Sequence, residues 1–186
     1  MMMGDKEYLF DGILRIIRER KALKCIPKNS VCCDICCSRG KFLKRIEATI
    51  KEGIGIDARV KNHKSGKITL INYKINSLFP LKSKTYDVVT LLASIEHFDN
   101  PEKILRESNR ILKKSGRIIL TTPLMKSNNI LRFMAKIGII DKALIDEHKE
   151  LFNPKKMKLI LEKIGFKDIK IKTFEFGLNM IIIARK

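Results

Sequence analysis

The chemically reactive side chains of this sequence concentrate in one short stretch, VCCDICCSRG, which spans Val31 to Gly40. It holds four of the five cysteines, and Cys33 and Cys36 have the C-x-x-C spacing that occurs in zinc sites. A closed zinc site needs four converging ligands, usually from two such pairs well apart in the sequence. The remaining cysteines overlap the same pair or lie upstream at Cys25, so we expect no metal site, and structural zinc is the weaker alternative.

The cysteines also suit the interior of a sheet. Because side chains alternate along a strand, Cys32 and Cys33 would point to opposite faces, as small buried hydrophobic residues of a central strand. Thiols this close together in a cytoplasmic chain do not indicate a disulfide framework. The N-terminal sequence MMMGDKEYLFDG has no apolar core or cleavage site, so we expect no signal peptide and a cytoplasmic location.

The same stretch has the layout of a strand, a loop and a helix that opens at Gly40. Loop amides and the start of such a helix bind polar or nucleoside ligands when the backbone can approach closely. Farther along, the strand EGIGID ends on Asp57, and an acidic side chain at that place can accept both hydroxyl groups of a ribose. One glycine and one aspartate alone are a weak indication of a nucleoside site.

The elements that would position these residues alternate between strands and helices. Helical spacing of apolar residues predicts helices over 8–23, 41–50, 100–116 and 153–165. In the third, Asn100 can cap the first turn, Pro101 suits the first helical position and Gly116 ends the helix. Short apolar runs predict strands at 30–35, 52–57, 67–73, 86–94 and 117–123, followed by a final strand pair that turns around Gly177.

This order predicts an α/β fold with a doubly wound, mostly parallel sheet, helices on both faces and an antiparallel last strand. In such sheets the ligand lies beyond the carboxyl ends of the strands, which places it over the loop after the first strand. We expect one domain over residues 1–186, with an N-terminal helix inside residues 1–27. No apolar run approaches the roughly 20 residues needed to cross a bilayer.

The composition is that of a globular protein, 45% hydrophobic and 32% charged, with a formal net charge of +19. Such a charge is compatible with a nucleic-acid or anionic-membrane partner. The lysines are spread along the whole chain, however, and aromatic residues that could stack on bases make up only 6%. We therefore favour a solvated basic surface over a dedicated nucleic-acid site. The composition does not predict an oligomeric state.

The second half of the chain carries an ordered set of motifs in YDVVTLLASIEHFDNPEKILRESNRILKKSGRIILTTP. It resembles the class I S-adenosylmethionine-dependent methyltransferases, and most closely the small-molecule branch that includes the ubiquinone-biosynthesis type enzymes. The matching residues are Asp87 to Val89, Glu96–His97, Pro101, Leu105 to Glu107, Arg110 to Leu112, Gly116, Thr122–Pro123, His148 and Gly165–Phe166. The resemblance implies a Rossmann-like sheet of seven strands, S-adenosylmethionine as the cofactor, no required metal, and methyl transfer to a small-molecule or lipid-like acceptor.

Carried over by position, the family's glycine-rich loop falls on Asp34, Cys36, Ser38 and Gly40, where the usual pattern is Asp-x-Gly-x-Gly-x-Gly. Cys36 and Ser38 therefore add side chains where the family has bare backbone. If either position needs a positive φ, a residue other than glycine costs about 1–2 kcal/mol there.

The resemblance also implies the rest of the cofactor site. Asp57 corresponds to the ribose-binding acid, with Ala58 beside it, and the backbone of Leu92 would face the methionine part of the cofactor. The aspartate that often contacts the adenine amino group is absent, and Asn76 or Ser77 is the nearest polar substitute. The segment after Asp57 is short, so we expect one of the usual helices to be trimmed.

On the acceptor side, His97 and His148 are the candidate general bases if the acceptor loses a proton of high pKa. Alternatively, His97 hydrogen-bonds within its own turn and His148 orients the helix that follows. The stretch 124–150 takes the place of the family's acceptor lid, is helical to about Ile145, and interleaves apolar with basic residues. The alternative for this stretch is a helix that packs on its own domain.

A second hypothesis is a degenerate methyltransferase fold that serves as a binding or scaffold protein, with nucleic acid among its candidate partners. The loss of two loop glycines and of the adenine-loop aspartate favours this hypothesis. Retention of Gly40, Asp57 and Glu96–His97 favours the enzyme, which is the function that we expect.

Overall fold

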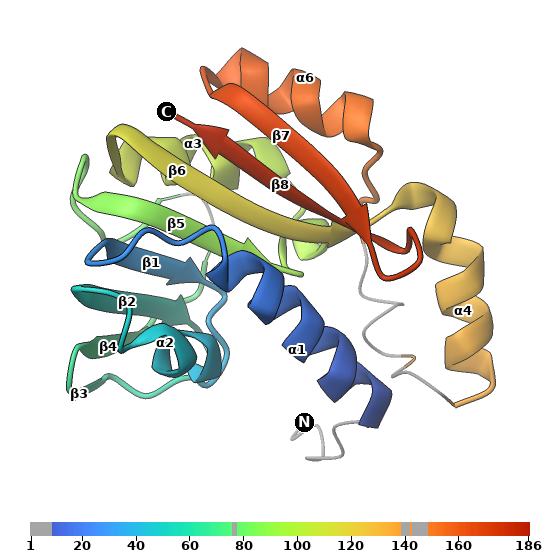
Figure 1. The fold of residues 1–186 in the computed structure, drawn as a ribbon, viewed down its shortest axis with the longest axis horizontal. Coiled ribbons are helices and arrows are strands. Elements are labelled where there is room, and N and C mark those ends of the chain that lie inside the picture. Colours follow the sequence, from blue (N-terminus) through green and yellow to red (C-terminus); the bar gives the residue numbers. More distant parts are fainter. Residues whose placement is uncertain (1–8, 76–77, 139–141, 143–148) are drawn as a thin grey trace.

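The strands form one eight-stranded sheet in the order β3-β4-β2-β1-β5-β6-β8-β7 (Figure 1). This computed structural model describes residues 9–75, 78–138, 142 and 149–186. The strands are β1 (Val31–Ile35), β2 (Glu52–Asp57), β3 (His63–Ser65), β4 (Ile68–Asn72), β5 (Tyr86–Leu92), β6 (Leu112–Pro123), β7 (Lys167–Phe174) and β8 (Asn179–Arg185). The first strand thus lies in the middle of the sheet, between β2 and β5, where the strand order reverses.

The directions of the strands confirm the predicted doubly wound sheet. Parallel pairing extends from β1 through β2 to β4 on one side, and through β5 to β6 on the other. The last strand, β8, is antiparallel to both β6 and β7. The predicted number of seven strands is wrong, because β3 adds a short antiparallel strand beside β4. Every residue of β3 is exposed, so no apolar pattern marked it in the sequence.

Helices cover both faces of the sheet, as predicted. They are α1 (Leu9–Leu23), α2 (Lys41–Ile46), α3 (Pro101–Ile111), α4 (Asn128–Lys136) and α6 (Pro154–Ile164). Residues of α1 and α2 pack with Cys32 and Val88, whereas residues of α3 and α6 pack with Cys33 and Val89 (Figure 1). Neighbouring cysteines of β1 therefore enter two different hydrophobic clusters, which confirms the alternation that the sequence predicts.

The helix predicted over 100–116 is shorter than expected. It ends at Ile111, and Leu112 is already extended and opens β6, where it pairs with Tyr86. Gly116 is part of this strand and does not end the helix. A Cβ on Gly116 would lie 3.1 Å from the carbonyl oxygen of Tyr86, so the glycine permits a close backbone approach there.

Two helices begin with the same Asn-Pro pair. Asn100 accepts a hydrogen bond from the amide of Lys103, 3.1 Å away, and Asn153 accepts one from the amide of Lys156, 2.8 Å away. The proline that follows each cap takes the first helical position, where no amide hydrogen bond is needed. Gly165 ends α6 with a φ of 102°, so the predicted bounds of this helix are confirmed.

Part of the predicted acceptor lid is helical. A short 3-10 helix, η2 (Met125–Ser127), leads directly into α4. Leu131 is buried, whereas Ile130 and Phe133 are 52% and 61% exposed. Residues 139–141 and 143–148 of the predicted stretch lie outside the described residues.

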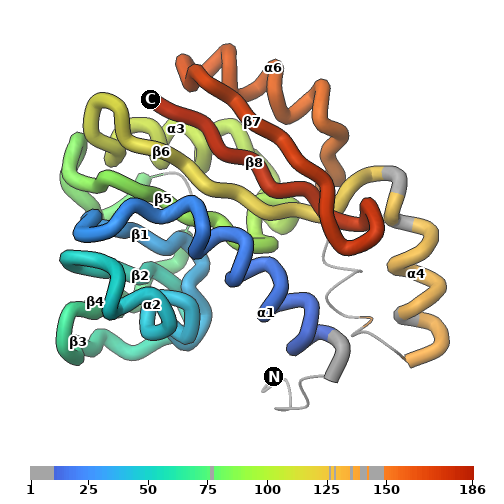
Figure 2. The backbone as a smooth tube through the Cα atoms, viewed as in Figure 1, coloured from blue at the N-terminus to red at the C-terminus, as the bar shows by residue number. Residues whose placement is uncertain are grey.

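The last two strands complete the sheet, with β7 as its edge strand. Figure 2 traces β7 and β8 as a hairpin with β8 against β6, and the turn between them contains Gly177, as predicted. No described helix is both long enough and apolar enough to span a bilayer.

We expect Asn153→Ala to lower the free energy of unfolding by about 1 kcal/mol, because the amide of Lys156 loses its acceptor. Asn153→Asp keeps an acceptor and serves as the matched control, with a change of a few tenths of a kcal/mol. Urea denaturation followed by circular dichroism measures both values. Equal midpoints for Asn153→Ala and the unaltered chain would contradict the assigned cap.

Candidate functional site

The loop after β1 has an unusual backbone. Cys36, Ser38 and Gly40 have φ values of 60°, 50° and 71°, so three alternate residues are left-handed. The amide of Cys36 donates to the carbonyl oxygen of Ile56 at 2.9 Å, which ties the loop to the end of β2. Two of these positions thus carry side chains in a conformation that favours glycine, and each costs about 1–2 kcal/mol.

Asp57, the last residue of β2, faces this loop. Its Oδ2 accepts a hydrogen bond from the amide of Ser38 at 2.8 Å, and its Oδ1 accepts one from the amide of Arg59 at 2.8 Å. The Arg59 guanidinium also donates to both oxygens, at 3.2 and 3.3 Å. Burial acts to raise the pKa of Asp57, but these donors outweigh it and hold the pKa below its ordinary value. The site therefore contains an ionised carboxylate with an arginine lying on it.

Asp34 lies deeper, near the end of β1, and is 4% exposed. The hydroxyl of Thr90 on the neighbouring β5 donates to its Oδ1 at 2.5 Å. Burial raises the pKa of Asp34 to about 7, since only this one hydroxyl opposes the loss of water and the nearby carboxylates Glu19 and Asp57 add to the effect. The carboxyl group is thus partly protonated near neutral pH.

The thiol of Cys36 belongs to the same site. Burial, with the charges of Asp57 and Asp34, raises its pKa to about 12, and the nearby Ser94 hydroxyl acts in the opposite direction. Cys36 therefore carries a protonated thiol at neutral pH and is a poor nucleophile or metal ligand.

The other cysteines of the stretch point elsewhere. Cys32 and Cys33 lie on opposite faces of the sheet, and Cys37 packs over Gly55, where an added Cβ would come within 2.6 Å of its sulfur. Across the described part of the chain, no group of three His, Cys, Asp or Glu side chains is arranged to hold a metal ion.

Buried polar atoms gather at the carboxyl ends of β5 and β6. Ser94 Oγ, Glu96 Oε2 and Thr122 Oγ1 are buried and have no hydrogen-bond partner of regular geometry among the described residues, although Ser94 lies near the Cys36 thiol and Thr122 near the Glu96 carboxyl group. Burial raises the pKa of Glu96, and the charge of the neighbouring His97 acts against the shift. The sequence indicated Glu96 and Thr122 only as parts of motifs and did not indicate Ser94. Buried polar groups without partners are a feature of sites that receive a ligand.

His97 is half-buried in η1 (Ile95–His97), and its amide donates to the carbonyl oxygen of Ser94 at 3.2 Å. A distant segment also holds the backbone of this turn, because the carbonyl oxygen of Glu96 accepts a hydrogen bond from the amide of Lys149 at 2.9 Å. The structure thus places His97 beside Glu96 and next to the end of β5. His148, the second predicted base, lies outside the described residues.

Leu92 and Ala58 both lie at the carboxyl ends of parallel strands, on the same side of the sheet as the loop after β1. Leu92 closes β5, and Ala58 follows Asp57 directly. Asn72, which sequence reasoning missed, holds this turn: its side-chain amide donates to the carbonyl oxygens of Ala58 and Val60. An asparagine at the end of a strand is the signal that could have identified it.

The loop that carries Asn76 and Ser77 is fixed just beyond them. These two residues lie outside the described residues, but Glu107 and Arg110 of α3 bind the segment that follows. Glu107 accepts the amide of Phe79 at 2.9 Å, and Arg110 donates to the carbonyl oxygens of Phe79 and Leu81. Two motif residues of the helix thus have a structural role in positioning the loop.

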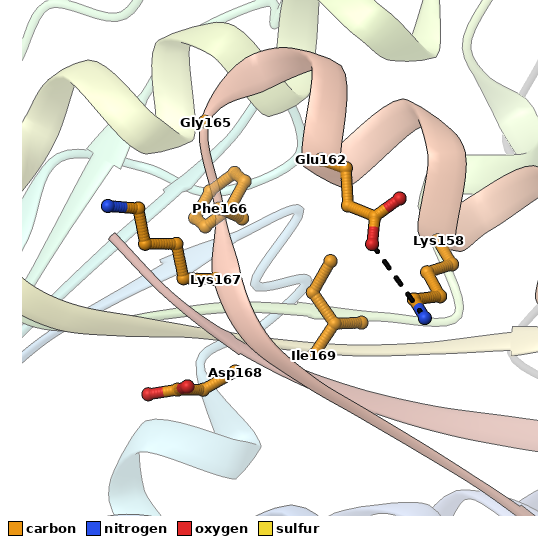
Figure 3. A pocket seen from close by; sticks show the side chains of 7 residues that line it. All are labelled: Lys158, Glu162, Gly165, Phe166, Lys167, Asp168 and Ile169. Carbon is orange, nitrogen blue, oxygen red and sulfur yellow. Dashed lines mark ion pairs between the residues drawn. The ribbon is translucent and has the colours of Figure 1, made fainter.

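A separate hollow of about 490 Å³ lies between α6 and β7 (Figure 3). It is lined by Lys158, Glu162, Gly165, Phe166, Lys167, Asp168 and Ile169, and an ion pair of 3.7 Å joins Lys158 to Glu162. Because it lies at the amino end of β7, it contains none of the predicted site residues.

Comparison with known proteins places this geometry in a family context. A family model described as a methyltransferase domain matches residues 5–171 of the chain. The ubiquinone biosynthesis O-methyltransferase of Pelagibacter ubique is 30% identical over 62% of this chain and 50% of its own length. The demethylmenaquinone methyltransferase of Staphylococcus saprophyticus is 26% identical over 87% of this chain and 80% of its own. The chain therefore spans only about half the length of the first of these curated relatives.

The fold has close counterparts among solved structures. A SAM dependent methyltransferase from Archaeoglobus fulgidus superimposes with a TM-score of 0.72 at 22% identity, over 98% of this chain and all of its own. This likeness confirms the Rossmann-like α/β fold that the sequence predicts.

Asp34 should make stability depend on pH. Its folded pKa of about 7 exceeds the ordinary 3.8, so the folded chain binds a proton that the unfolded chain releases between these values. We expect the free energy of unfolding to fall by about 2–4 kcal/mol as pH rises from 4 to 7 through this group. Asp34→Asn should remove this component, and the difference between two urea titration series measures it.

The control is Glu52→Gln, which removes an exposed carboxylate at the other end of the sheet. Its pH curve should run parallel to that of the unaltered chain. A parallel curve for Asp34→Asn as well would show that Asp34 has an ordinary pKa.

Proposed function

The chain belongs to the methyltransferase domain family, whose model matches residues 5–171, and on this basis we propose that it transfers a methyl group from S-adenosylmethionine to a small-molecule acceptor. The observation that carries the proposal is the loop after β1. Three alternate residues there have positive φ, and the buried Asp57 carboxylate is bonded to the loop amide of Ser38. The backbone of this loop, which we call the cradle, lies beside an acidic side chain. Such an arrangement suits a nucleoside ligand.

The residues at the loop fit this cofactor. Asp57 is ionised, nearly buried and directed at the cradle, so its oxygens are placed to accept the two ribose hydroxyls. The Arg59 side chain that lies on Asp57 is 72% exposed, so it can turn into water when a ribose arrives. We assign Asp34, Cys36, Ser38 and Gly40 to the cradle, Ala58 to the ribose end and Leu92 to the methionine end. For Asn76 and Ser77, contact with the adenine stays a prediction.

When bound, S-adenosylmethionine supplies a methyl group that its sulfonium already activates, so the protein has mainly to align the acceptor and exclude water. We assign the acceptor side to the buried polar atoms of Ser94, Glu96 and Thr122, which can hydrogen-bond polar groups of the acceptor. His97, beside Glu96, would take a proton from an acceptor that must lose one. His148 stays a predicted second base.

Exposed apolar side chains near the carboxyl end of β6 support an apolar or lipid-like acceptor. Ile130 and Phe133 of α4 and Ile137 just after it are 52–61% exposed, and Met125 before it is 47% exposed. One curated relative is named for ubiquinone biosynthesis and the other for demethylmenaquinone, which supports the same chemical class of acceptor. We therefore assign the 124–150 segment to acceptor binding. One domain over residues 1–186 and a cytoplasmic location stay predictions.

Calorimetry with S-adenosylmethionine and with its demethylated product, S-adenosylhomocysteine, tests the proposal. We expect both to bind with a measurable heat, and Asp57→Asn to weaken each at least about tenfold, because a neutral amide is a poorer acceptor for two hydroxyls. Glu52→Gln, at the far end of the same strand, is the matched control and should bind like the unaltered chain. Absence of binding at millimolar ligand would reject the enzyme and favour the scaffold hypothesis.

The side chains in the cradle give a further test. Cys36→Gly with Ser38→Gly should tighten cofactor binding by up to about tenfold, since bare backbone permits a closer approach of the ligand. The strain of about 1–2 kcal/mol per residue is present with and without ligand, so its relief should affect the stability of the fold and not the affinity. Asn29→Gly is the control, because Asn29 also has a positive φ, 58°, but lies at the amino end of β1. Its affinity for the cofactor should not change. Weaker binding by the double variant would mean that the Cys36 and Ser38 side chains contact the ligand favourably.

A further inference from the structure

The connection between β2 and β4 lacks the usual crossover helix. These strands are parallel neighbours, and parallel neighbours are usually joined through a helix that packs on the sheet. Here residues 58–67 contain no helix, and the short strand β3 pairs with β4 instead. The sheet face beside α2 is therefore left without the cover that a crossover helix would provide.

A groove of about 750 Å³ occupies this place. Its floor is formed by Ile68 and Leu70 of β4, and its walls come from α1, α2, β3 and the Arg39–Gly40 end of the loop. The basic residues in the walls are Arg15, Arg39, Lys41, Lys44, Arg45 and His63. No carboxylate is among the described residues that line it, so the groove concentrates positive charge that the sequence spreads along the chain.

Two arginines are held in fixed positions at this groove. The buried carboxylate of Glu19 forms ion pairs with Arg15, at 3.4 Å, and with Arg45. Lys44 pairs with Glu47 at 2.7 Å and is still 67% exposed. Five arginine and lysine side chains line the groove and none of the described lining residues is acidic, so the lining is positive.

We propose that this groove binds the phosphate backbone of a single-stranded nucleic acid. Cations contributed by several elements around one groove suit a chain that carries one negative charge per nucleotide. A flexible single strand can follow a concave groove of this kind, whereas a stiff duplex would contact mainly the side chains at its opening. No aromatic side chain lines it among the described residues, so binding is independent of base sequence.

Two other anionic partners fit less well. An acidic helix would need a broad apolar floor, but Ile68 is only 6% exposed and Leu70 is half-buried. An anionic bilayer is flat and meets convex surfaces, whereas these cations line a concave one. The groove is also distinct from the acceptor side, because it opens beyond α2 and β4 while Glu96 and Thr122 lie at β5 and β6.

Fluorescence polarisation with a labelled 12-nucleotide oligouridylate tests the proposal. We expect a Kd of about 1–100 μM at 50 mM salt, with log affinity falling linearly as log salt rises. Lys41→Gln with Lys44→Gln should weaken binding at least tenfold and reduce the salt slope by about 1.4, or about 0.7 for each lost phosphate contact. Lys41→Arg with Lys44→Arg keeps both charges and should restore binding.

Lys167→Gln with Lys170→Gln is the matched control, since it removes the same charge from exposed positions on β7 and should bind like the unaltered chain. Figure 3 shows where Lys167 lies. Equal losses in both glutamine variants would show diffuse attraction and overturn the proposal. So would tighter binding of duplex DNA, polyglutamate or phosphatidylglycerol vesicles than of the oligonucleotide. Circular dichroism confirms that each variant is folded. Calorimetry with S-adenosylmethionine is a separate readout, so loss of methyl-donor binding alone leaves this inference intact.

Discussion

The hydrogen bond from the Ser38 amide to the Asp57 carboxylate is the interaction on which the candidate site depends. It joins the loop after β1 to the end of β2, so two neighbouring strands present their ends as one surface. A buried carboxylate is stable only with donors around it, and a left-handed loop persists only when its surroundings hold it. The loop amide therefore stabilises the charge of the Asp57 carboxylate, and the carboxylate in turn holds the left-handed loop in place. The amide of Cys36, bonded to Ile56, strengthens the same connection.

Much of this arrangement follows from local sequence patterns. Buried apolar runs located the central strands, alternation separated Cys32 from Cys33, and the Asn-Pro pairs marked where α3 and α6 begin. The unusual loop was also predictable, because the motif places Cys36 and Ser38 at positions that glycine normally occupies. These features depend on residues close together in the chain, where side-chain chemistry and backbone conformation are directly coupled.

What the sequence did not reveal depends on contacts between distant segments. Gly116 has the local context of a helix end, yet the backbone of Tyr86 and the start of β6 determine its role. The strand β3 has only exposed residues and exists because β4 offers it a free edge. Ser94 lies just beyond β5 and Thr122 on β6, and the basic residues of the groove come from four separate elements. An even distribution of lysines along a sequence thus says little about the surface that the fold assembles.

The arginine on Asp57 has a consequence for selectivity. If a nucleoside binds at Asp57 as proposed, its hydroxyls must replace the bonds from the Arg59 guanidinium to the two carboxylate oxygens. A sugar with two adjacent hydroxyls could replace both guanidinium bonds, whereas a 2′-deoxy sugar could replace only one and would leave the other oxygen with its backbone amide as the sole donor. On the proposed function, the site would thus favour ribose over deoxyribose without any side chain that blocks the deoxy sugar.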